Sequence, residues 1–271
     1  MRALLILAIV LCAATGPAPA QRYHREGGYA PKLPPNEAFD RGFFVCRMMY
    51  TSVLREAGGI GWQTDYPYSE INFMTRLGEL TKTDVELDST RIPNHYSVRL
   101  TDDALFGCPF VIASDIGTAA FTNEEVARLR TYLLKGGFLW VDDFWGTFAW
   151  EHWTQELGKV LPPSSFPIVD VPVNDALFET LYVLTKLPQI TSIQFWRRSG
   201  GTTTSERGPD SAVPHLRAIR DANNRIMVLM THNTDIGDSW EREGEDYEYF
   251  YRFAHDGYAL GINALVHVMA H

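Results

Sequence analysis

The clearest pattern of apolar and polar positions lies in residues 122–146. Apolar side chains recur every three or four residues up to two consecutive glycines, which predicts an amphipathic helix. Thr122 and Glu125 have the spacing of a capping box at its start, and the glycines end it because glycine enters the left-handed conformation freely. Residues 138–141 are then continuously apolar, as in a strand covered on both faces. The sequence therefore predicts one helix–strand unit of an α/β sheet.

Apolar runs and amphipathic segments alternate along most of the chain. Strands are predicted over residues 43–50, 85–87, 109–114, 190–195 and 225–231. Helices are predicted over residues 69–80, 148–157, 175–185 and 258–270. This alternation favours a doubly wound, mainly parallel sheet within a three-layer α/β sandwich. Residues 199–209, rich in glycine, serine and threonine, are expected to form a mobile loop.

The N-terminal segment differs in composition from the rest of the chain. An apolar run over residues 3–14 is followed by Ala18-Pro19-Ala20, which predicts a secretory signal peptide cleaved before Gln21. An uncleaved membrane anchor is the alternative, but the run is shorter than the roughly 20 residues that a spanning helix needs. The interpretation is an exported protein, periplasmic or extracellular, with no transmembrane segment after cleavage.

The predicted organisation is a signal peptide, a leader and one domain. It places the signal peptide at residues 1–20, a flexible Gly/Pro-rich leader at 21–38 and a single α/β domain at 39–271. The full chain is 45% hydrophobic and 21% charged, which is enough for a sizeable core. Its formal charge of −9 argues against nucleic acid or anionic lipid as a partner.

Export changes the interpretation of the cysteines. Without Cys12, only Cys46 and Cys108 remain, in a compartment where disulfides form. A bridge requires their strands to be adjacent and in register, and two buried thiols are the alternative. Neither cysteine has the local pattern of a catalytic thiol, and no C-x-x-C metal spacing occurs.

Several motifs in one order carry a resemblance to a known family. They are Arg47-Met48-Met49-Tyr50, residues 62–67 with Asn72, residues 129–139 with Asp142-Asp143, and Gly261-Ile262-Asn263. From residue 43 to its end, the chain resembles the bacterial domain-of-unknown-function family 4159. The resemblance implies the flavodoxin-like fold of the class I glutamine amidotransferase superfamily, and export or membrane association, often beside proteins with von Willebrand-type domains and MoxR-type ATPases. It implies no known activity.

The resemblance also indicates what is missing. Amidotransferases of that superfamily carry a nucleophilic cysteine in a G-x-C-x-G turn after a central strand, and the nearest counterpart here, residues 141–145, has no cysteine. Glutaminase activity is therefore not expected, because an aspartate does not replace a thiolate in acyl transfer. Residues 113–117 lack the first glycine of G-x-S-x-G, and no glycine-rich phosphate loop occurs.

Polar residues stand at the predicted strand ends. They are Arg47, Tyr50, Asp115, Asp142, Asp143, His232, Asn233 and Asp235. Carboxyl ends of parallel strands converge, so Asp142, Asp143 and His232 are candidate catalytic acids and bases. With Asp115 they also suit a hard-cation site, although no motif requires a metal or other cofactor. In the alternative, Asp143 caps the next helix and Asp142 pairs with Arg47, because buried charges require partners.

A second set of residues suggests ligand binding. With Arg47, Tyr50 and Asp115, the ligand-binding candidates are Trp62, Asp65, Tyr66, Asn72 and Trp145. Aromatic and acidic side chains on a loop can stack on a sugar ring and bind its hydroxyls. Equally, Asp65 can cap the turn before Pro67 while Trp62 covers the sheet edge.

Three classes of function fit these observations. The favoured one is a non-catalytic binding or assembly module of the cell envelope, whose partner is an envelope protein or a small polar ligand such as a sugar. It explains a missing nucleophile beside retained edge residues. The others are a hydrolase, carbohydrate-active or otherwise, that uses Asp142 or Asp143, with or without a metal, and a structural metal protein.

Overall fold

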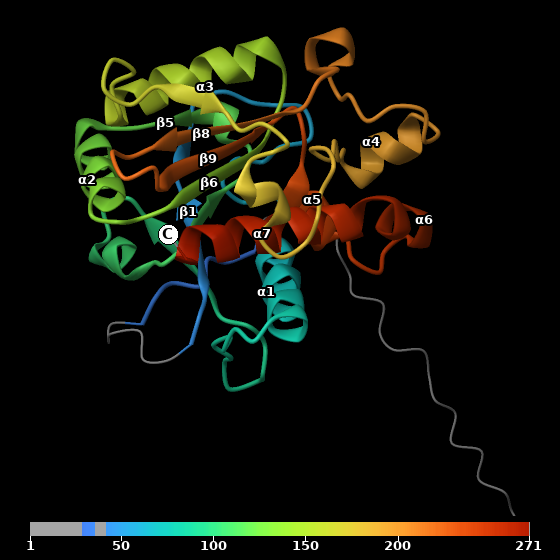
Figure 1. Ribbon diagram of the computed structural model, residues 1–271, viewed down its shortest axis with the longest axis horizontal. Coiled ribbons are helices and arrows are strands. Elements are labelled where there is room, and N and C mark those ends of the chain that lie inside the picture. The colour runs from blue at the N-terminus through green and yellow to red at the C-terminus, as the bar shows by residue number, and fades with distance from the viewer. Residues whose placement is uncertain (1–28, 36–41, 271) are drawn as a thin grey trace, which may run out of the picture.

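The computed structural model describes residues 29–35 and 42–270 (Figure 1). The predicted signal peptide and most of the leader lie outside the described residues. The described part of the leader contacts the domain. The backbone N–H of Lys32 donates to the Tyr66 hydroxyl at 2.9 Å, and its carbonyl accepts from the N–H of Ser97 at 2.7 Å. Residues 29–35 are therefore held against the domain by hydrogen bonds.

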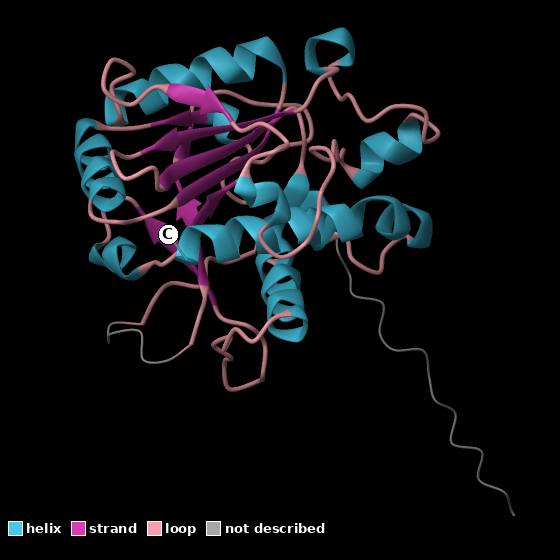
Figure 2. Ribbon diagram, viewed as in Figure 1, coloured by secondary structure: helices cyan, strands magenta, loops and turns pink. Residues whose placement is uncertain are grey.

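A seven-stranded sheet forms the centre of the structure, in the order β3-β1-β4-β6-β9-β8-β7 (Figure 2). The strands are β1 (Val45–Met49), β3 (His95–Arg99), β4 (Val111–Ala113), β6 (Leu139–Phe144), β7 (Ile168–Asp170), β8 (His215–Arg220) and β9 (Ile226–His232). Strands β3, β1, β4, β6 and β9 are parallel, whereas β8 is antiparallel to both β9 and β7. Counted along the chain, the five parallel strands lie in the order 2-1-3-4-5.

Helices cover both faces of this sheet and give three layers (Figure 1). Helices α2 (Asn123–Leu134) and α3 (Gly146–Val160) cover one face, and α1 (Tyr68–Leu80), α5 (Ile236–Glu241) and α7 (His255–Ala270) cover the other. Neighbouring strand residues point to opposite faces, so Val141 packs in one core and Trp140 in the other. No helix in the described part of the chain is long and apolar enough to cross a bilayer. The expected mainly parallel α/β architecture is confirmed.

Short elements complete the fold. They are the two-stranded sheet of β2 (Thr51–Ser52) and β5 (Ala119–Ala120), helices α4 (Ile193–Arg198) and α6 (Tyr247–Tyr249), the π-helix η5 (Phe250–Ala254), and the 3-10 turns η1 (Asp103–Gly107), η2 (Ile116–Thr118), η3 (Ala176–Glu179) and η4 (Gly208–Ser211).

The predicted helix–strand unit is confirmed in α2 and β6. The Thr122 hydroxyl accepts a hydrogen bond from the N–H of Glu125, whose carboxylate accepts one from the N–H of Thr122. Gly136 has a φ of 106°, as the stop after α2 requires. Strand β6 runs beyond the predicted residues 138–141, so Asp142 and Asp143 lie within it.

Parts of the predicted secondary structure are wrong. Residues 190–195 do not form a strand, because the Ser192 hydroxyl caps the N–H of Phe195 and starts α4. The helix predicted over residues 175–185 is only the turn η3. Residues 85–87 make only isolated bridges. Strands β3, β7 and β8 were not predicted, because their polar residues conceal the strand pattern.

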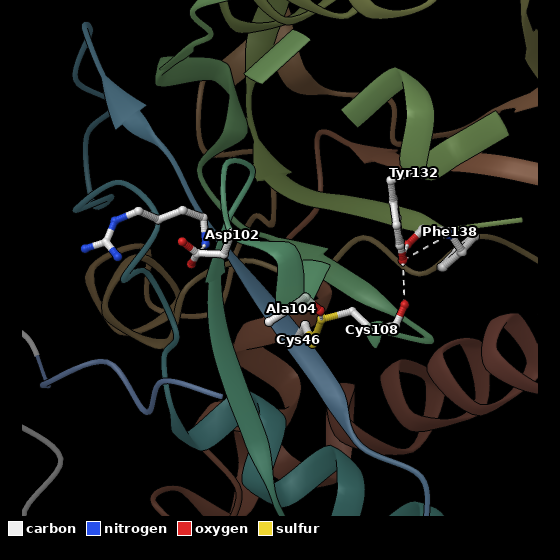
Figure 3. Close-up of a disulfide and its surroundings, with 7 residues drawn as sticks. Cys46, Asp102, Ala104, Cys108, Tyr132 and Phe138 are labelled. Atoms are coloured by element: carbon white, nitrogen blue, oxygen red, sulfur yellow. Dashed lines mark hydrogen bonds between the residues drawn. A yellow bond between two sulfur atoms is a disulfide. The ribbon is translucent and has the colours of Figure 1, made fainter. Parts of the chain in front are cut away.

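Cys46 and Cys108 form a disulfide, with their Cα atoms 5.9 Å apart (Figure 3). Cys46 is in β1 and Cys108 precedes β4, and these two strands pair side by side. The Tyr132 hydroxyl donates to the carbonyl of Cys108 at 2.9 Å and accepts from the N–H of Phe138 at 3.2 Å, which ties helix α2 to the same place. The bridge closes a sequence separation of 62 residues, worth about 4 kcal/mol in the loop-entropy treatment.

Candidate functional site

A cavity of about 530 Å³ lies at the carboxyl edge of the parallel strands. Its walls come from the segment after β2, the loop after β4, the end of β6, helix α5 and residues 192–207. The chain adds β3 on one side of β1 and then β4 on the other side, so the strand order switches between the neighbouring strands β1 and β4. Open α/β sheets bind ligands at such a switch point, outside the carboxyl ends of the strands.

Carboxylates gather in this cavity. Two groups of three have ligand atoms within 4.8 Å of one another: Asp65, Asp143 and Asp235, here called the Asp143 triad, and Asp65, Asp238 and Glu241, here called the Glu241 triad. Asp65 belongs to both, so the two triads form one continuous acidic surface. Three more acidic side chains line the cavity, namely Glu56, Asp115 and Glu206.

An irregularity in β6 brings Asp143 to the cavity. Its pairing with β9 shifts register between Val141 and Phe144, and Asp143 has a φ of 53°. A bulge re-aims side chains, and the left-handed backbone is uncommon for any residue except glycine. Asp65 and Asp115 also have positive φ, of 65° and 52°. Such backbone conformations gather at functional sites.

Hydrogen bonds fix one carboxylate oxygen of each member of the Asp143 triad. Asp65 Oδ2 accepts from the Ser114 hydroxyl at 2.9 Å, and Asp143 Oδ1 accepts from Trp145 Nε1 at 2.8 Å. Asp235 Oδ1 caps helix α5 by accepting from the N–H of Asp238 at 2.8 Å. The second oxygen of each carboxylate receives no hydrogen bond from the described residues. The triad is held in position while half of its acceptors stay available.

Burial and mutual repulsion disfavour negative charge in the Asp143 triad. Burial is the largest cause that raises the pKa of Asp65 to about 8, followed by the charge of Asp238. Burial raises the pKa of Asp143 and Asp235 well above the ordinary value, and the charges that act most on both are negative. Protons or a bound cation must therefore neutralise the triad at neutral pH.

Arginines neutralise other parts of the cavity. Arg242 lies 2.7 Å from Glu241 and 3.4 Å from Asp238, so the Glu241 triad has a cation of its own. Arg207 pairs with Glu56 at 3.4 Å in another part of the cavity wall. Among the described residues, no lysine or arginine forms an ion pair with Asp143 or Asp235. The Asp143 triad therefore differs from the Glu241 triad, two of whose carboxylates contact an arginine.

Asp115 adds an unsatisfied acceptor to the same cavity. Its side chain is almost completely buried, with the residue 2% exposed, and Oδ2 accepts from the N–H of Gly61 at 2.7 Å. Oδ1 is buried without a hydrogen-bond partner. Burial raises the pKa of Asp115 to about 6, and burial together with Asp115 raises the pKa of Glu56 to about 8.

The predicted ligand-binding residues divide into two groups. Those that line the cavity are Asp65, Tyr66, Asp115 and Trp145, together with the catalytic candidate Asp143. Those that lie outside its lining are Arg47, Tyr50, Trp62 and Asn72, together with the catalytic candidates Asp142 and His232. Strand ends therefore predict the location of the cavity better than they predict which side chains face it.

Arg47 and Tyr50 support the site from inside the protein. Arg47 is fully buried, forms an ion pair with Glu70 at 2.5 Å, and donates to the hydroxyls of Ser114 and Ser69. The Tyr50 hydroxyl contacts the carbonyls of Ser114 and Asp115 at 2.7 Å each. Both residues hold the loop after β4 that carries Asp115.

Asp142 lies outside the cavity lining and has partners of its own. Its Oδ1 accepts from the Thr231 hydroxyl at 2.5 Å and its Oδ2 from the N–H of Gly237 at 2.8 Å, while burial raises its pKa to about 6. The alternative in which Asp142 pairs with Arg47 and Asp143 caps the next helix is wrong. Arg47 pairs with Glu70, and the N-cap of α3 is Trp145, not Asp143.

His232 is packed among aromatic rings. Its Nδ1 accepts from Arg217 Nη1 at 3.2 Å, which leaves Nε2–H to donate to the carbonyl of Gly146 at 3.0 Å. Burial, with the nearby charge of Arg217, lowers its pKa to about 4. Both ring nitrogens are engaged, so His232 is held neutral by the fold.

Trp62 and Asn72 likewise have structural contacts. The ring of Trp62 lies 5.6 Å from that of Tyr66, and Asn72 Nδ2 donates to the carbonyl of Trp240 at 2.8 Å.

Sequence reasoning missed several charged residues that line the cavity, namely Glu56, Asp238, Glu241, Glu206, Arg207 and Arg242. One signal was available, because Asp235, Asp238 and Glu241 recur every three residues and so share a helix face.

The three layers and the acidic cavity define an α/β protein whose candidate site lies at the carboxyl edge of a parallel sheet. The chain belongs to the family described as Domain of unknown function (DUF4159), whose profile matches residues 51–269. The match includes every carboxylate of both triads. A search of the curated proteins finds no match to this sequence.

Proposed function

We propose that this protein is an exported, non-catalytic binding module of the cell envelope that keeps a class I glutamine amidotransferase-like scaffold. The strand order 2-1-3-4-5 supports the scaffold, since flavodoxin-like proteins have that order. Asp143 supports it too, because its left-handed backbone stands at the end of the fourth parallel strand. Amidotransferases of the superfamily carry their nucleophilic cysteine on a sharp turn after a central strand.

The observation that carries the binding function is the cavity itself. Its volume of about 530 Å³ lies within the range of small-molecule sites. Tyr66, Trp145 and Phe195 supply aromatic surface beside the carboxylates. Because the polar lining consists mainly of acceptors, it favours a ligand rich in hydroxyl or ammonium donors, such as a sugar, an amino sugar or an amine.

The lining supports binding more than acyl transfer. Among the described residues that line the cavity, there is no cysteine and no histidine. Ser192 lines it, but its hydroxyl caps helix α4 and its N–H donates to Glu206. The described lining therefore offers no cysteine–histidine or serine–histidine pair of the kind that acyl transfer uses.

The binding function can be tested by thermal denaturation with small sugars, amino sugars and amines. A bound ligand stabilises the folded protein, so at least one of these classes is expected to raise the Tm. Phe195→Ala, in the lining, should abolish that rise. Phe148 lies outside the lining and the residue is 69% exposed, so Phe148→Ala should preserve the rise. The proposal fails if no class raises the Tm or if both variants respond like the wild type.

A hydrolase is a second candidate, and the position of Asp143 beside the carboxylates of Asp65 and Asp235 is the observation that favours it. A carboxyl whose pKa is raised beside other carboxylates can act as a general acid. Purified protein should then hydrolyse glycan or ester substrates, and Asp143→Asn should abolish the activity while Asp142→Ala, if folded, retains it. Equal activity in Asp143→Asn and the wild type would contradict this candidate.

Export is the part of the proposal that rests on residues 1–20 alone. The segment has the basic start, apolar run and small residues of a cleavable signal. Fractionation of bacteria that express the full chain should recover a shortened protein outside the cytoplasm. Recovery of the uncut chain in the cytoplasm would contradict export without affecting the binding site.

A further inference from the structure

We propose that the Asp143 triad binds a hard divalent cation, Ca²⁺ or Mg²⁺, through one oxygen each of Asp65, Asp143 and Asp235. This inference rests on the proposed function, because the cation would form part of the same ligand site. A ligand with hydroxyl groups could then complete the coordination of the ion from the cavity side.

The separation of the three carboxylates fits a single ion. Their ligand atoms lie within 4.8 Å of one another. Two oxygens that each lie about 2.4 Å from one Ca²⁺ are at most about 4.8 Å apart, so every pair in the triad meets this limit. The donors are carboxylates only, and the described lining contains no histidine or cysteine. Such a set selects hard cations over zinc or copper.

Hydrogen bonds preorganise the carboxylates of the Asp143 triad. The donors from Ser114, Trp145 and the N–H of Asp238 each hold one oxygen, which fixes the direction of the other. Hydrogen-bonded ligands of this kind are usual around protein metal sites.

Asp115 is the independent observation that points to a ligand. Its Oδ1 is a buried acceptor without a partner, in the wall of the same cavity, and its charge acts on Asp143. Buried acceptors without donors are rare, and ordered water or an ion is a common explanation. Water molecules bound to the cation would supply donors to Asp115 Oδ1 without direct coordination.

The Glu241 triad is the less suitable of the two. Arg242 already contacts Glu241 and Asp238, so a second cation there would meet the charge of the guanidinium. The Asp143 triad has no such partner among the described residues. A single ion per chain is therefore expected, not a pair of ions bridged by Asp65.

Calorimetric titration of chelator-treated, purified protein with CaCl₂ and, separately, with MgCl₂ tests the proposal. We expect one ion per chain for at least one of the two salts, together with a rise in Tm. Asp235→Asn should weaken binding at least tenfold, because the amide carries no charge. Asparagine is an equally good N-cap, so this variant keeps helix α5.

Asp246→Asn is the matched control. Asp246 also caps a helix, by accepting from the N–H of Tyr249 at 3.0 Å, but it lies outside the cavity lining. It should bind the ion like the wild type. Asp143→Asn, with folding checked by circular dichroism, provides a second variant of the triad and should lose binding as Asp235→Asn does.

The outcomes separate this inference from the proposed function. No binding of either ion by the wild type, or wild-type affinity in both triad variants, overturns the cation site. If a sugar or amine still raises the Tm of chelator-treated protein, the binding function stands without the ion. If the ion binds with one-to-one stoichiometry and no small ligand does, the cation site stands and the proposed function fails.

Discussion

Two buried groups of charges lie near the same edge of the sheet and differ in how they are satisfied. Arg47 and Glu70 form a fully buried ion pair whose remaining donors reach Ser69 and Ser114. In the Asp143 triad, three acids face one another without an ion pair. The first group has what a stable fold requires, whereas the second carries an electrostatic cost. A cost of this kind is explained by a site that binds something.

Glu70→Ala should produce the largest loss of stability, because it leaves the Arg47 guanidinium buried and unpaired. We expect the free energy of unfolding to fall by about 3–5 kcal/mol in urea denaturation. Glu79→Ala, which removes an exposed ion pair with Arg76, is the control and should change it by less than about 1 kcal/mol. A loss for Glu70→Ala as small as for the control would contradict the structural role of the first group.

The next largest effect is a loss of folding stability at low pH. His232 has a folded pKa of about 4 and an ordinary value of 6.5, so between these values only the unfolded chain takes up the proton. Stability from this group is therefore present above pH 6.5 and is lost as the pH falls to 4. The loss is about 3 kcal/mol, since each pKa unit corresponds to about 1.4 kcal/mol.

Other groups titrate over the same range, so the comparison with His232→Gln isolates this contribution. The stability difference between wild type and variant should shrink by about 3 kcal/mol from pH 6.5 to pH 4. A difference that stays constant over that range would show that His232 is not held neutral.

Ser114 joins the two groups, since it accepts from Arg47 and donates to Asp65. Ser114→Ala should lower the free energy of unfolding by about 2 kcal/mol, because hydrogen bonds to charged partners are lost. It should also weaken the binding of Ca²⁺ or Mg²⁺ about tenfold, as loss of a supporting contact does. Unchanged affinity in calorimetry would mean that the two groups are independent.

Asp143→Asn should have the smallest effect on stability, and one of opposite sign. The folded protein keeps the pKa of Asp143 high, whereas the unfolded chain ionises freely at neutral pH, so a neutral amide removes a cost. In the presence of a chelator we therefore expect the free energy of unfolding to rise. A fall in the free energy of unfolding would show that the carboxylate stabilises the fold.

Local signals in the sequence predicted the helix–strand unit of α2 and β6 well. The capping box and the two glycines act through neighbouring residues, so they need no knowledge of the rest of the fold. Strand β8 was missed because its sequence, HLRAIR, mixes charged residues with apolar ones. Its pairing with β7 joins segments more than 40 residues apart, for example Val169 with Ala218.

The candidate site was predicted only in part, because it also depends on contacts between segments far apart in the sequence. Strand ends located Asp115 and Asp143 at the carboxyl edge, but the alternation of strand side chains sends Arg47 toward α1 and leaves Asp142 with Thr231. The bulge that turns Asp143 into the cavity depends on the register between β6 and β9. No pattern in the sequence specifies that register.

The central claim is that the Asp143 triad is a binding site and not a strained part of the fold. Its most direct test is anomalous diffraction from crystals grown with Mn²⁺, which prefers the same oxygen ligands as Mg²⁺ and Ca²⁺. The account predicts one anomalous peak between the carboxylates of Asp65, Asp143 and Asp235. No peak in the cavity, or a peak only beside Asp238 and Glu241, would contradict it.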